Sequence, residues 1–196
     1  MARPQSPDYD KRRQAIVEAA GHLFARRGFQ GASIADLATS CGTSKALIYH
    51  YFSSKEDILY EVMAAHLDDL VDAADDAMRA GSARERLRAL THAFMQLYMG
   101  AQDSHKVLLN ELDNLPPERK AEVVAKQRRI IAVVETLVRE IRPETNPVTL
   151  PLAMLFFGMI NWTHTWFRPG GKTRPEELAD LAFDLMLNGL DRVQAS

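Results

Sequence analysis

The sequence predicts an all-α protein, and three observations lead to this fold class. Apolar residues recur at intervals of three and four along most of the chain, which is the spacing of one helix face. Strand signals are nearly absent, because β-branched residues rarely cluster and no Asn-Gly or Asp-Gly turn separates alternating apolar runs. Serines, glycines and prolines divide the periodic segments where helices begin and end. We expect about nine helices, forming a three-helix N-terminal head and a larger helical body.

The first two helices of the head are marked by a stop and a cap. The first is expected at 10–27, where apolar residues follow helical spacing and Gly28 comes next. Ser33 is followed three residues later by Asp36, which is the pattern of a capping box. This pattern predicts a short second helix at 34–40.

The segment after the second helix has the features of a helix-turn-helix. Ala38 is small enough for two helices to cross closely there, and Gly42, four residues later, suits the left-handed backbone of a tight turn. Thr43 or Ser44 then caps a third helix that ends at Tyr51. We expect the outward side chains of this third helix to enter the major groove of DNA.

Six further helices are expected in the body, again from caps and breakers. Ser53 or Ser54 caps the fourth, Gly81 and Ser82 break the chain before the fifth, and a pair of prolines opens the seventh. Prolines also bracket the loop before the eighth helix. The expected ranges are 54–79, 83–100, 103–114, 117–141, 148–167 and 175–192.

Charge divides the chain at Lys55 into two domains. Residues 1–55 hold eight Lys/Arg against four Asp/Glu, whereas residues 56–196 hold sixteen against twenty-two. A basic head on an acidic body suggests a nucleic-acid-binding domain at 1–55 and a separate domain at 56–196. The single cysteine, Cys41, excludes an intramolecular disulfide. Without an apolar leader or a membrane-length apolar run, we expect a cytoplasmic protein.

The run from Gly42 to Leu59, GTSKALIYHYFSSKEDIL, resembles the signature of the TetR/AcrR family of repressors. The family has a three-helix DNA-binding head, a variable helical body that binds a small molecule, and a dimer interface made by the last two long helices. The resemblance therefore implies a double-stranded DNA operator, a small-molecule effector and a second copy of this chain as partners.

From this resemblance and the expected third helix, we expect nine DNA-contacting residues. Lys45 suits guanine O6 and N7, Ala46 suits a thymine methyl group, and tyrosine hydroxyls suit phosphate oxygens. A solvent-exposed role without base contact is an equal alternative for His50, and solvation is an equal alternative to phosphate contact for Arg3, Lys11, Arg12 and Arg13. The nine residues are Ser33, Thr43, Ser44, Lys45, Ala46, Tyr49, His50, Tyr51 and Lys55.

A second segment, FFGMINWTHTWFRPGGKTRPEELA at 156–179, resembles a TetR subgroup whose effectors are acyl-coenzyme A thioesters. The resemblance implies that an acyl chain enters a methionine and aromatic pocket, and that phosphates seek cations such as Arg119, Lys120, Arg128 or Arg129. Ordinary core and a solvated helix face are the alternatives, as is a hydrophobic drug-like effector of an efflux or stress operon. The expected pocket residues are Met95, Tyr98, Met99, Asn110, Glu111, Phe157, Asn161, Trp162 and Thr165.

The last two expected helices predict a homodimer. The eighth is apolar around most of its circumference, which is more than one bundle face needs, so part of it is expected to pack on a second subunit with the ninth. Two heads on a two-fold axis would read an inverted repeat. The expected interface residues are Phe156, Ile160, His164, Phe167, Leu178, Leu181 and Leu185.

Two other classes of function were weighed against a DNA-binding regulator. The sequence has no Gly-rich phosphate loop, HExxH or GxSxG motif, so an enzyme would need residues that converge in space, such as His164 with Glu111. A helical adaptor would instead bind an acidic protein through its basic head. We expect a non-enzymatic repressor that is released from DNA by an effector and that uses no cofactor or metal.

Overall fold

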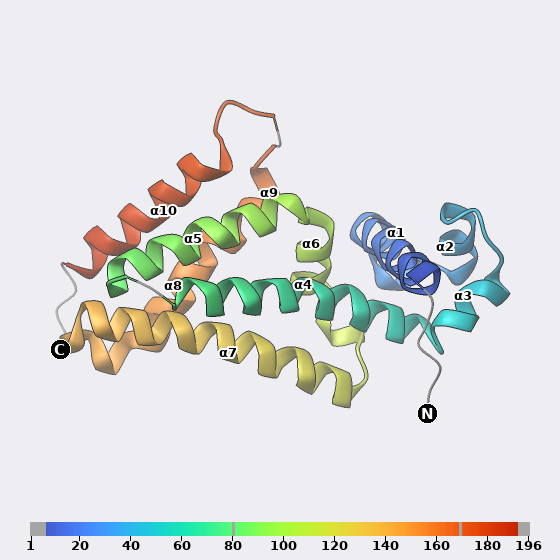
Figure 1. The fold of residues 1–196 in the computed structure, drawn as a ribbon, viewed down its shortest axis with the longest axis horizontal. Coiled ribbons are helices and arrows are strands. Elements are labelled where there is room, and N and C mark those ends of the chain that lie inside the picture. The colour runs from blue at the N-terminus through green and yellow to red at the C-terminus, as the bar shows by residue number, and fades with distance from the viewer. Residues whose placement is uncertain (1–6, 80, 169, 192–196) are drawn as a thin grey trace. The chain divides into compact units, whose positions relative to one another are not determined.

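A computed structural model describes residues 7–79, 81–168 and 170–191 (Figure 1). All regular secondary structure in these residues is helical, as the sequence predicted. The elements are α1 (Pro7–Gly31), α2 (Ile34–Ser40), α3 (Lys45–Tyr51), α4 (Lys55–Ala77), α5 (Ala83–Gly100), α6 (Gln102–Asn110), η1 (Leu112–Asn114), α7 (Pro117–Ile141), η2 (Pro143–Val148), α8 (Thr149–Asn161), α9 (Thr163–Trp166) and α10 (Pro175–Leu190).

Contacts within the chain define two compact units. The first contains the described residues up to His66 together with Asp103–Val123, and the second contains Leu67–Gln102 together with the residues from Val124 onward. The first unit is thus larger than the expected head of residues 1–55, because it also includes the start of α4, all of α6 except its first residue, η1, and the start of α7.

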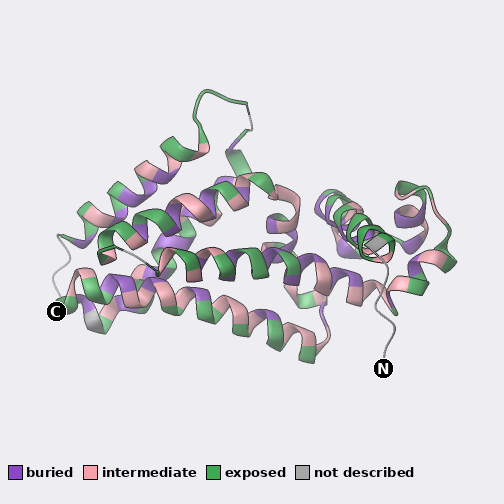
Figure 2. Ribbon diagram, in the orientation of Figure 1, coloured by how far each residue is buried: buried purple, intermediate pink, exposed green. Residues whose placement is uncertain are grey.

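A small apolar core holds the three head helices together within the first unit. Phe24, Leu37 and Ile48 are almost completely buried, one from each of α1, α2 and α3. Phe29 adds an edge-on ring contact with Phe24, with ring centroids 5.4 Å apart. Figure 2 shows the alternation of buried and exposed positions around these helices, which is the pattern expected for amphipathic helices that share one core.

The C-terminal end of α1 is bent and is capped by two lysines. Gly28 has a φ of 73° and a ψ of 159°, so the regular helix ends there and the chain continues at a new angle. Lys106 Nζ donates to the carbonyl of Ala25 at 2.6 Å. Lys55 Nζ donates to the carbonyls of Phe29 at 2.9 Å and Ala32 at 3.0 Å. Cations near a helix C-terminus satisfy carbonyls that have lost their helical partners.

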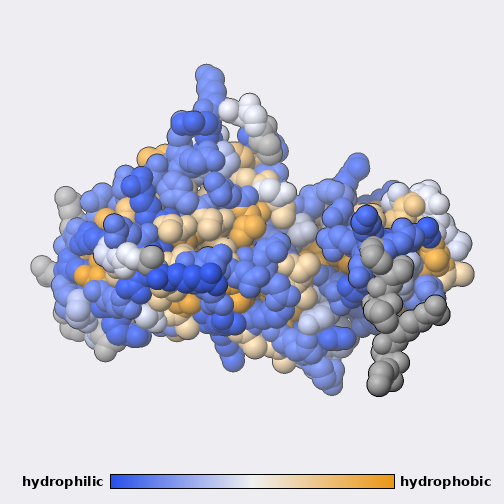
Figure 3. Space-filling model, viewed as in Figure 1, coloured by the Kyte–Doolittle hydropathy of each residue, from blue (hydrophilic) through white to orange (hydrophobic). Residues whose placement is uncertain are grey.

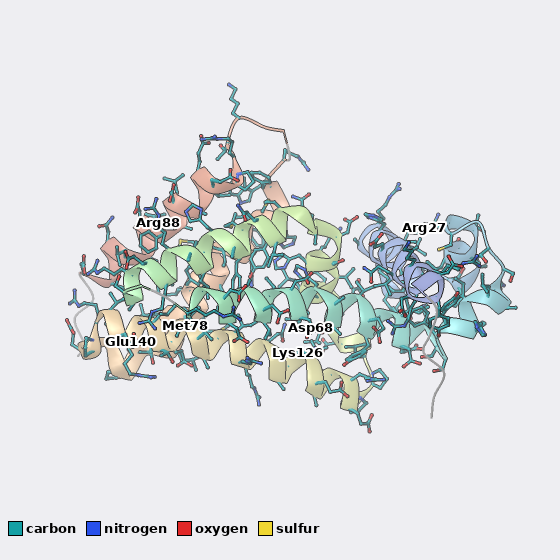
Figure 4. The ribbon with its side chains drawn as sticks, in the orientation of Figure 1. Arg27, Asp68, Met78, Arg88, Lys126 and Glu140 are labelled. Atoms are coloured by element: carbon teal, nitrogen blue, oxygen red, sulfur yellow. The ribbon has the colours of Figure 1, made fainter. Side chains whose placement is uncertain are left out.

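Within the second unit, α10 packs along α5. Asp180 of α10 accepts hydrogen bonds from two residues of α5, Arg88 at 2.7 Å and His92 at 2.8 Å. These bonds, the one from Arg88 above all, lower the pKa of the Asp180 carboxyl. Figure 4 shows Arg88 on the side of α5 that faces α10, and Asp68 and Lys126 facing each other from α4 and α7. Hydrophilic side chains cover much of the visible surface, with apolar patches between them (Figure 3).

The expected helix at 148–167 is divided into α8 and α9. The Thr163 hydroxyl donates to the carbonyl of Ile160 at 2.6 Å, and His164 Nδ1 donates to the carbonyl of Asn161 at 2.7 Å. These side chains compete with the backbone for the carbonyls that would continue the helix. The expected helix at 103–114 is likewise divided into α6 and η1.

Candidate nucleic-acid interface

The turn between α2 and α3 has the geometry predicted for a helix-turn-helix. Ala38 is buried at the crossing, and its carbonyl accepts a 2.9 Å hydrogen bond from the Thr43 amide. Gly42 has a φ of 60°, the left-handed conformation that favours glycine. The turn is therefore fixed by one small side chain and one glycine, as the sequence indicated.

Serine caps fix the N-termini of α2 and α3. Ser33 Oγ accepts from the Asp36 amide at 3.1 Å, while Asp36 accepts from the Ser33 amide at 3.0 Å, which completes the predicted capping box. The bonds from Ser33 lower the pKa of the Asp36 carboxyl, with a smaller effect from Arg27. Ser44 Oγ accepts from the Leu47 amide at 3.2 Å. Both serines thus have structural roles, and their phosphate contacts stay predictions.

One face of α3 is buried and the other is free. Ile48 is fully buried, whereas Lys45, Ala46, Tyr49 and His50 are all exposed. The four exposed residues fall at i, i+1, i+4 and i+5, so they share one side of a helix. The structure therefore places on one side of α3 the three residues considered for base contacts, Lys45, Ala46 and His50, together with Tyr49, which was expected to contact the DNA backbone.

The other expected DNA-contacting residues are less exposed. Thr43 and Tyr51 are half-buried, and they border a hollow of about 240 Å³ together with Arg12. Lys55 is also half-buried, and its ammonium lies 4.0 Å from the centroid of the Phe29 ring in addition to its two bonds to carbonyls. Its phosphate contact stays a prediction, but the structure shows a capping role that the sequence did not suggest.

The N-terminal cations of the head differ in their surroundings. Arg13 is half-buried and forms a 2.6 Å ion pair with Glu61, so it is part of the fold. Arg12 forms only an exposed pair with Asp8 at 3.3 Å, and Lys11 is exposed. Arg3 lies outside the described residues.

Three of the expected pocket residues belong to the apolar core of the second unit. Met95, Tyr98 and Phe157 are buried, and the rings of Tyr98 and Phe157 lie 5.9 and 6.3 Å from the Phe94 ring. Burial raises the pKa of the Tyr98 hydroxyl. Met99 is half-buried and borders a hollow of about 380 Å³ that also contains Phe167 and Arg174.

The expected polar pocket residues are divided between the two units. Asn110 is exposed and donates to the carbonyl of Lys106 at 2.8 Å, and Glu111 accepts from Asn114 at 2.8 Å. Both belong to the first unit, whereas Asn161, Trp162 and Thr165 belong to the second.

Of these residues in the second unit, Trp162 and Thr165 are exposed, and the Thr165 hydroxyl donates to the carbonyl of Trp162 at 2.8 Å. The buried Oδ1 of Asn161 makes no hydrogen bond within the described residues. Asn110, Glu111 and Thr165 therefore satisfy their hydrogen bonds locally, which removes the reason for placing them against a ligand.

Three of the four expected phosphate-binding cations are paired with carboxylates. Lys120 lies 2.6 Å from Asp113, Arg129 pairs with Asp75, and Arg119 lies 3.5 Å from Glu122. Arg128 is exposed. The alternative of a charged helix face in solvent fits these contacts better than a phosphate site.

The expected dimer residues separate into core and surface. Phe156, Ile160 and Phe167 are buried within the chain itself, so their assignment to an interface is corrected. His164 and Leu178 are half-buried, and Leu181 and Leu185 are exposed. Sequence reasoning missed other large apolar side chains that are exposed on α8: Leu150, Met154 and Leu155. Trp166 of α9 is exposed as well. A helix that is apolar on all sides does not reveal which side faces its own core.

A buried histidine pair in the first unit also escaped the sequence analysis. His66 Nε2 of α4 and His105 Nδ1 of α6 lie 3.1 Å apart, and both rings are buried. Burial lowers the pKa of His66 to about 4, because the charged form loses its hydration. No sequence signal links two histidines that are 39 residues apart.

Within the described residues, no helix is long and apolar enough to cross a membrane. The same part of the chain contains no group of three or more His, Cys, Asp or Glu side chains placed to bind a metal ion.

Comparison with known proteins supports the helix-turn-helix assignment. Residues 16–62 match the family model of the tetR family of bacterial regulatory proteins, and residues 80–190 match that of tetracycline repressor-like C-terminal domains. The repressor KstR2 of Rhodococcus jostii is 25% identical over 186 residues, which cover 91% of each chain.

Solved structures give the same result. A TetR-family regulator from Bordetella parapertussis is 34% identical with a TM-score of 0.87, covering 94% of this chain and 98% of that one. AibR, solved in complex with isovaleryl coenzyme A and operator DNA, is 27% identical with a TM-score of 0.79, covering 89% of this chain and 97% of its own. The chain therefore belongs to the TetR family, whose members are DNA-binding transcription regulators and not enzymes.

Proposed function

We propose that this protein is a homodimeric cytoplasmic repressor that binds an inverted-repeat operator and is released from it by a small molecule, with acyl-coenzyme A thioesters as the first candidates. The observation that carries the proposal is the exposed face of α3, which places Lys45, Ala46, Tyr49 and His50 on one side of a capped helix. This face combines a cationic donor, a methyl group and two aromatic side chains that bear polar atoms. It suits a major groove, where both hydrogen bonds and apolar contacts distinguish bases.

The exposed apolar residues of the second unit support the homodimer. Seven of them lie on α8, α9 and α10 or at the junction of α8 and α9, and soluble monomers rarely leave so many large apolar side chains of neighbouring elements in water. α8 and α9 carry no Asp, Glu, Lys or Arg, whereas α10 carries four acidic residues. The proposed interface consists of Met154, Leu155, Trp162, Trp166, Leu181 and Leu185.

Oligomeric state tests this part of the proposal directly. We expect the wild-type chain to sediment as a dimer and a Leu155→Glu/Leu185→Glu variant to sediment as a monomer, because each charge would be desolvated in the interface. Tyr49→Glu serves as the control, since Tyr49 is also an exposed large side chain but lies on α3. A double variant that stays dimeric would place the interface elsewhere.

Two observations support an acyl-coenzyme A effector. AibR, similar over most of this chain, was solved with isovaleryl coenzyme A. The second unit also has a core rich in methionine and aromatic residues, and beside it the hollow next to Met99 contains both apolar side chains and Arg174. A hollow with an apolar wall and few polar groups suits an amphipathic ligand.

Selection of operators followed by release tests the whole proposal. The purified chain is used to enrich sites from a random duplex library, and the preferred site is titrated with and without a panel of acyl-coenzyme A thioesters at two salt concentrations. An enriched palindrome that one thioester releases supports every part. Enrichment of a site that no thioester releases would contradict the acyl-coenzyme A effector and leave the DNA-binding function standing. A chain that enriches no site would contradict the DNA-binding function.

A further inference from the structure

An aromatic cluster joins the first turns of α1 to the C-terminal end of α3. The ring centroids of Tyr9 and Tyr51 lie 4.6 Å apart with the planes tilted by 38°. Tyr9 also meets His50 edge-on at 6.2 Å, and His50 meets Tyr51 edge-on at 5.3 Å. Two of the three rings belong to the residues expected to touch DNA, while Tyr9 does not.

A second contact, one helical turn later, braces the same region. The guanidinium carbon of Arg13 lies 5.0 Å from the centroid of the Phe52 ring, which follows α3 directly. Arg13 is also held by its ion pair with Glu61. Because Tyr9 and Arg13 are four residues apart, they lie on one face of α1, and this face holds the end of the recognition helix.

The Tyr51 side chain combines a held ring with an unused hydroxyl. The ring is half-buried against Tyr9, but its hydroxyl makes no hydrogen bond to any described residue. Arg12, Thr43 and Tyr51 border the same hollow of about 240 Å³, so one residue that carries a guanidinium and two that carry hydroxyls surround one space. Guanidinium and hydroxyl groups are the donors that proteins use for DNA phosphates.

We propose that Tyr9 is a positioning residue for DNA binding, and that it holds the Tyr51 ring so that the Tyr51 hydroxyl meets a backbone phosphate. The inference rests on the proposed function, because it assumes that the head binds duplex DNA. It adds a residue outside the helix-turn-helix whose effect passes through Tyr51. A phenol ring that is stacked before binding loses less rotamer freedom when the complex forms.

A double-mutant cycle tests this route. DNA affinity is measured by fluorescence anisotropy for the full-length wild type, Tyr9→Ala, Tyr9→Phe, Tyr51→Phe and the double variant Tyr9→Ala/Tyr51→Phe, on a mixed-sequence duplex and on the selected operator. We expect Tyr9→Ala to weaken binding about 3- to 10-fold, the range of an aromatic pair. Tyr9→Phe keeps the ring and should stay within about twofold. In the Tyr51→Phe background, Tyr9→Ala should weaken DNA binding by less than about twofold, because the hydroxyl that Tyr9 positions is already absent.

Three results would overturn the inference. Equal losses from Tyr9→Ala in both backgrounds would show that Tyr9 acts independently of Tyr51, and an unchanged affinity for Tyr51→Phe would show that there is no hydroxyl contact to position. A shallower dependence of DNA affinity on salt in Tyr9→Ala than in the wild type would mean that this variant had lost a cation contact, because a neutral tyrosine releases no counterion.

Val17→Ala controls for general destabilisation of α1. Val17 is a buried residue of the same helix, so this change should lower the melting temperature and leave the DNA affinity unchanged below the transition. If the wild type binds neither duplex, the proposed function fails, and that result differs from wild-type binding that Tyr9→Ala does not alter.

Discussion

The α2–α3 hairpin and the α8–α10 region differ in how their structure is specified. In the hairpin, a capping box at Ser33, a cap at Ser44 and the left-handed Gly42 define each boundary within a few residues of sequence. In α8, apolar residues occupy nearly every position, and only the surrounding helices decide that Phe156 is buried and Leu155 exposed. Local chemistry specifies the first region, whereas tertiary packing specifies the second.

The largest expected effect tests the region that depends on packing. Phe94→Ala should lower the free energy of unfolding by about 3 to 5 kcal/mol, because it removes a fully buried ring that contacts Tyr98 and Phe157. Urea denaturation measures the loss. In the Leu155→Glu/Leu185→Glu background, Trp162→Ala removes a ring that is 65% exposed and should change the free energy of unfolding little. A loss as large as that of Phe94→Ala would contradict the assignment of core and surface.

His66 is expected to lower the free energy of unfolding by about 2 to 3 kcal/mol when the pH falls from 7 to 4.5. Its pKa is lowered to about 4 in the fold, below the value of about 6.5 in an unfolded chain. As the pH falls, His66 is therefore protonated in the unfolded state before it is protonated in the folded state. Its contribution to stability is fully present above pH 6.5 and is lost as the pH falls toward 4. Denaturation of wild type and His66→Gln at several pH values measures the difference, and identical pH profiles for the two would contradict it.

Replacing a glycine by alanine should change the stability in opposite directions at Gly42 and at Gly189. Gly42→Ala should destabilise the protein by about 1 kcal/mol, since an alanine strains at a φ of 60° even though its Cβ would have no neighbour within 4 Å. Gly189→Ala, inside α10, also meets nothing within 4 Å and should stabilise by up to about 1 kcal/mol. Thermal melts of the two variants check the signs.

The smallest expected effect concerns an exposed ion pair. Arg129→Gln removes the partner of Asp75 on the surface of the second unit. It should lower the free energy of unfolding by less than about 0.5 kcal/mol. Arg13→Gln provides the contrast, because Arg13 is half-buried between Glu61 and Phe52 and should cost more. Chemical denaturation of the two variants at low and high salt measures and compares their losses of stability.

How far the sequence predicts this structure follows the same division. The α2 boundaries, the capping box and the roles of Ala38 and Gly42 were all predicted and are confirmed, because each depends on residues within one or two turns. The fold class and the family were also predicted and are confirmed.

Long-range relationships were beyond the sequence. The depth of burial of Phe156, the pairing of His66 with His105, and the contact of Tyr9 with Tyr51 depend on which helices become neighbours. A pattern of apolar residues indicates that a face is buried but does not identify what covers it. The local geometry of the candidate DNA interface was therefore predictable from sequence, and its DNA contacts stay predictions. Which residues of the expected ligand and dimer regions are buried was not predictable.

The lysines that cap α1 also give the protein a chemical reporter. Amine-reactive reagents need an accessible amine, and Lys55 is half-buried with hydrogen bonds to two carbonyls. It should be acylated more slowly than the exposed Lys11, Lys45 and Lys172. Labelling followed by mass spectrometry would thus detect any loosening at the end of α1 as faster labelling at a single residue, without a spectroscopic probe.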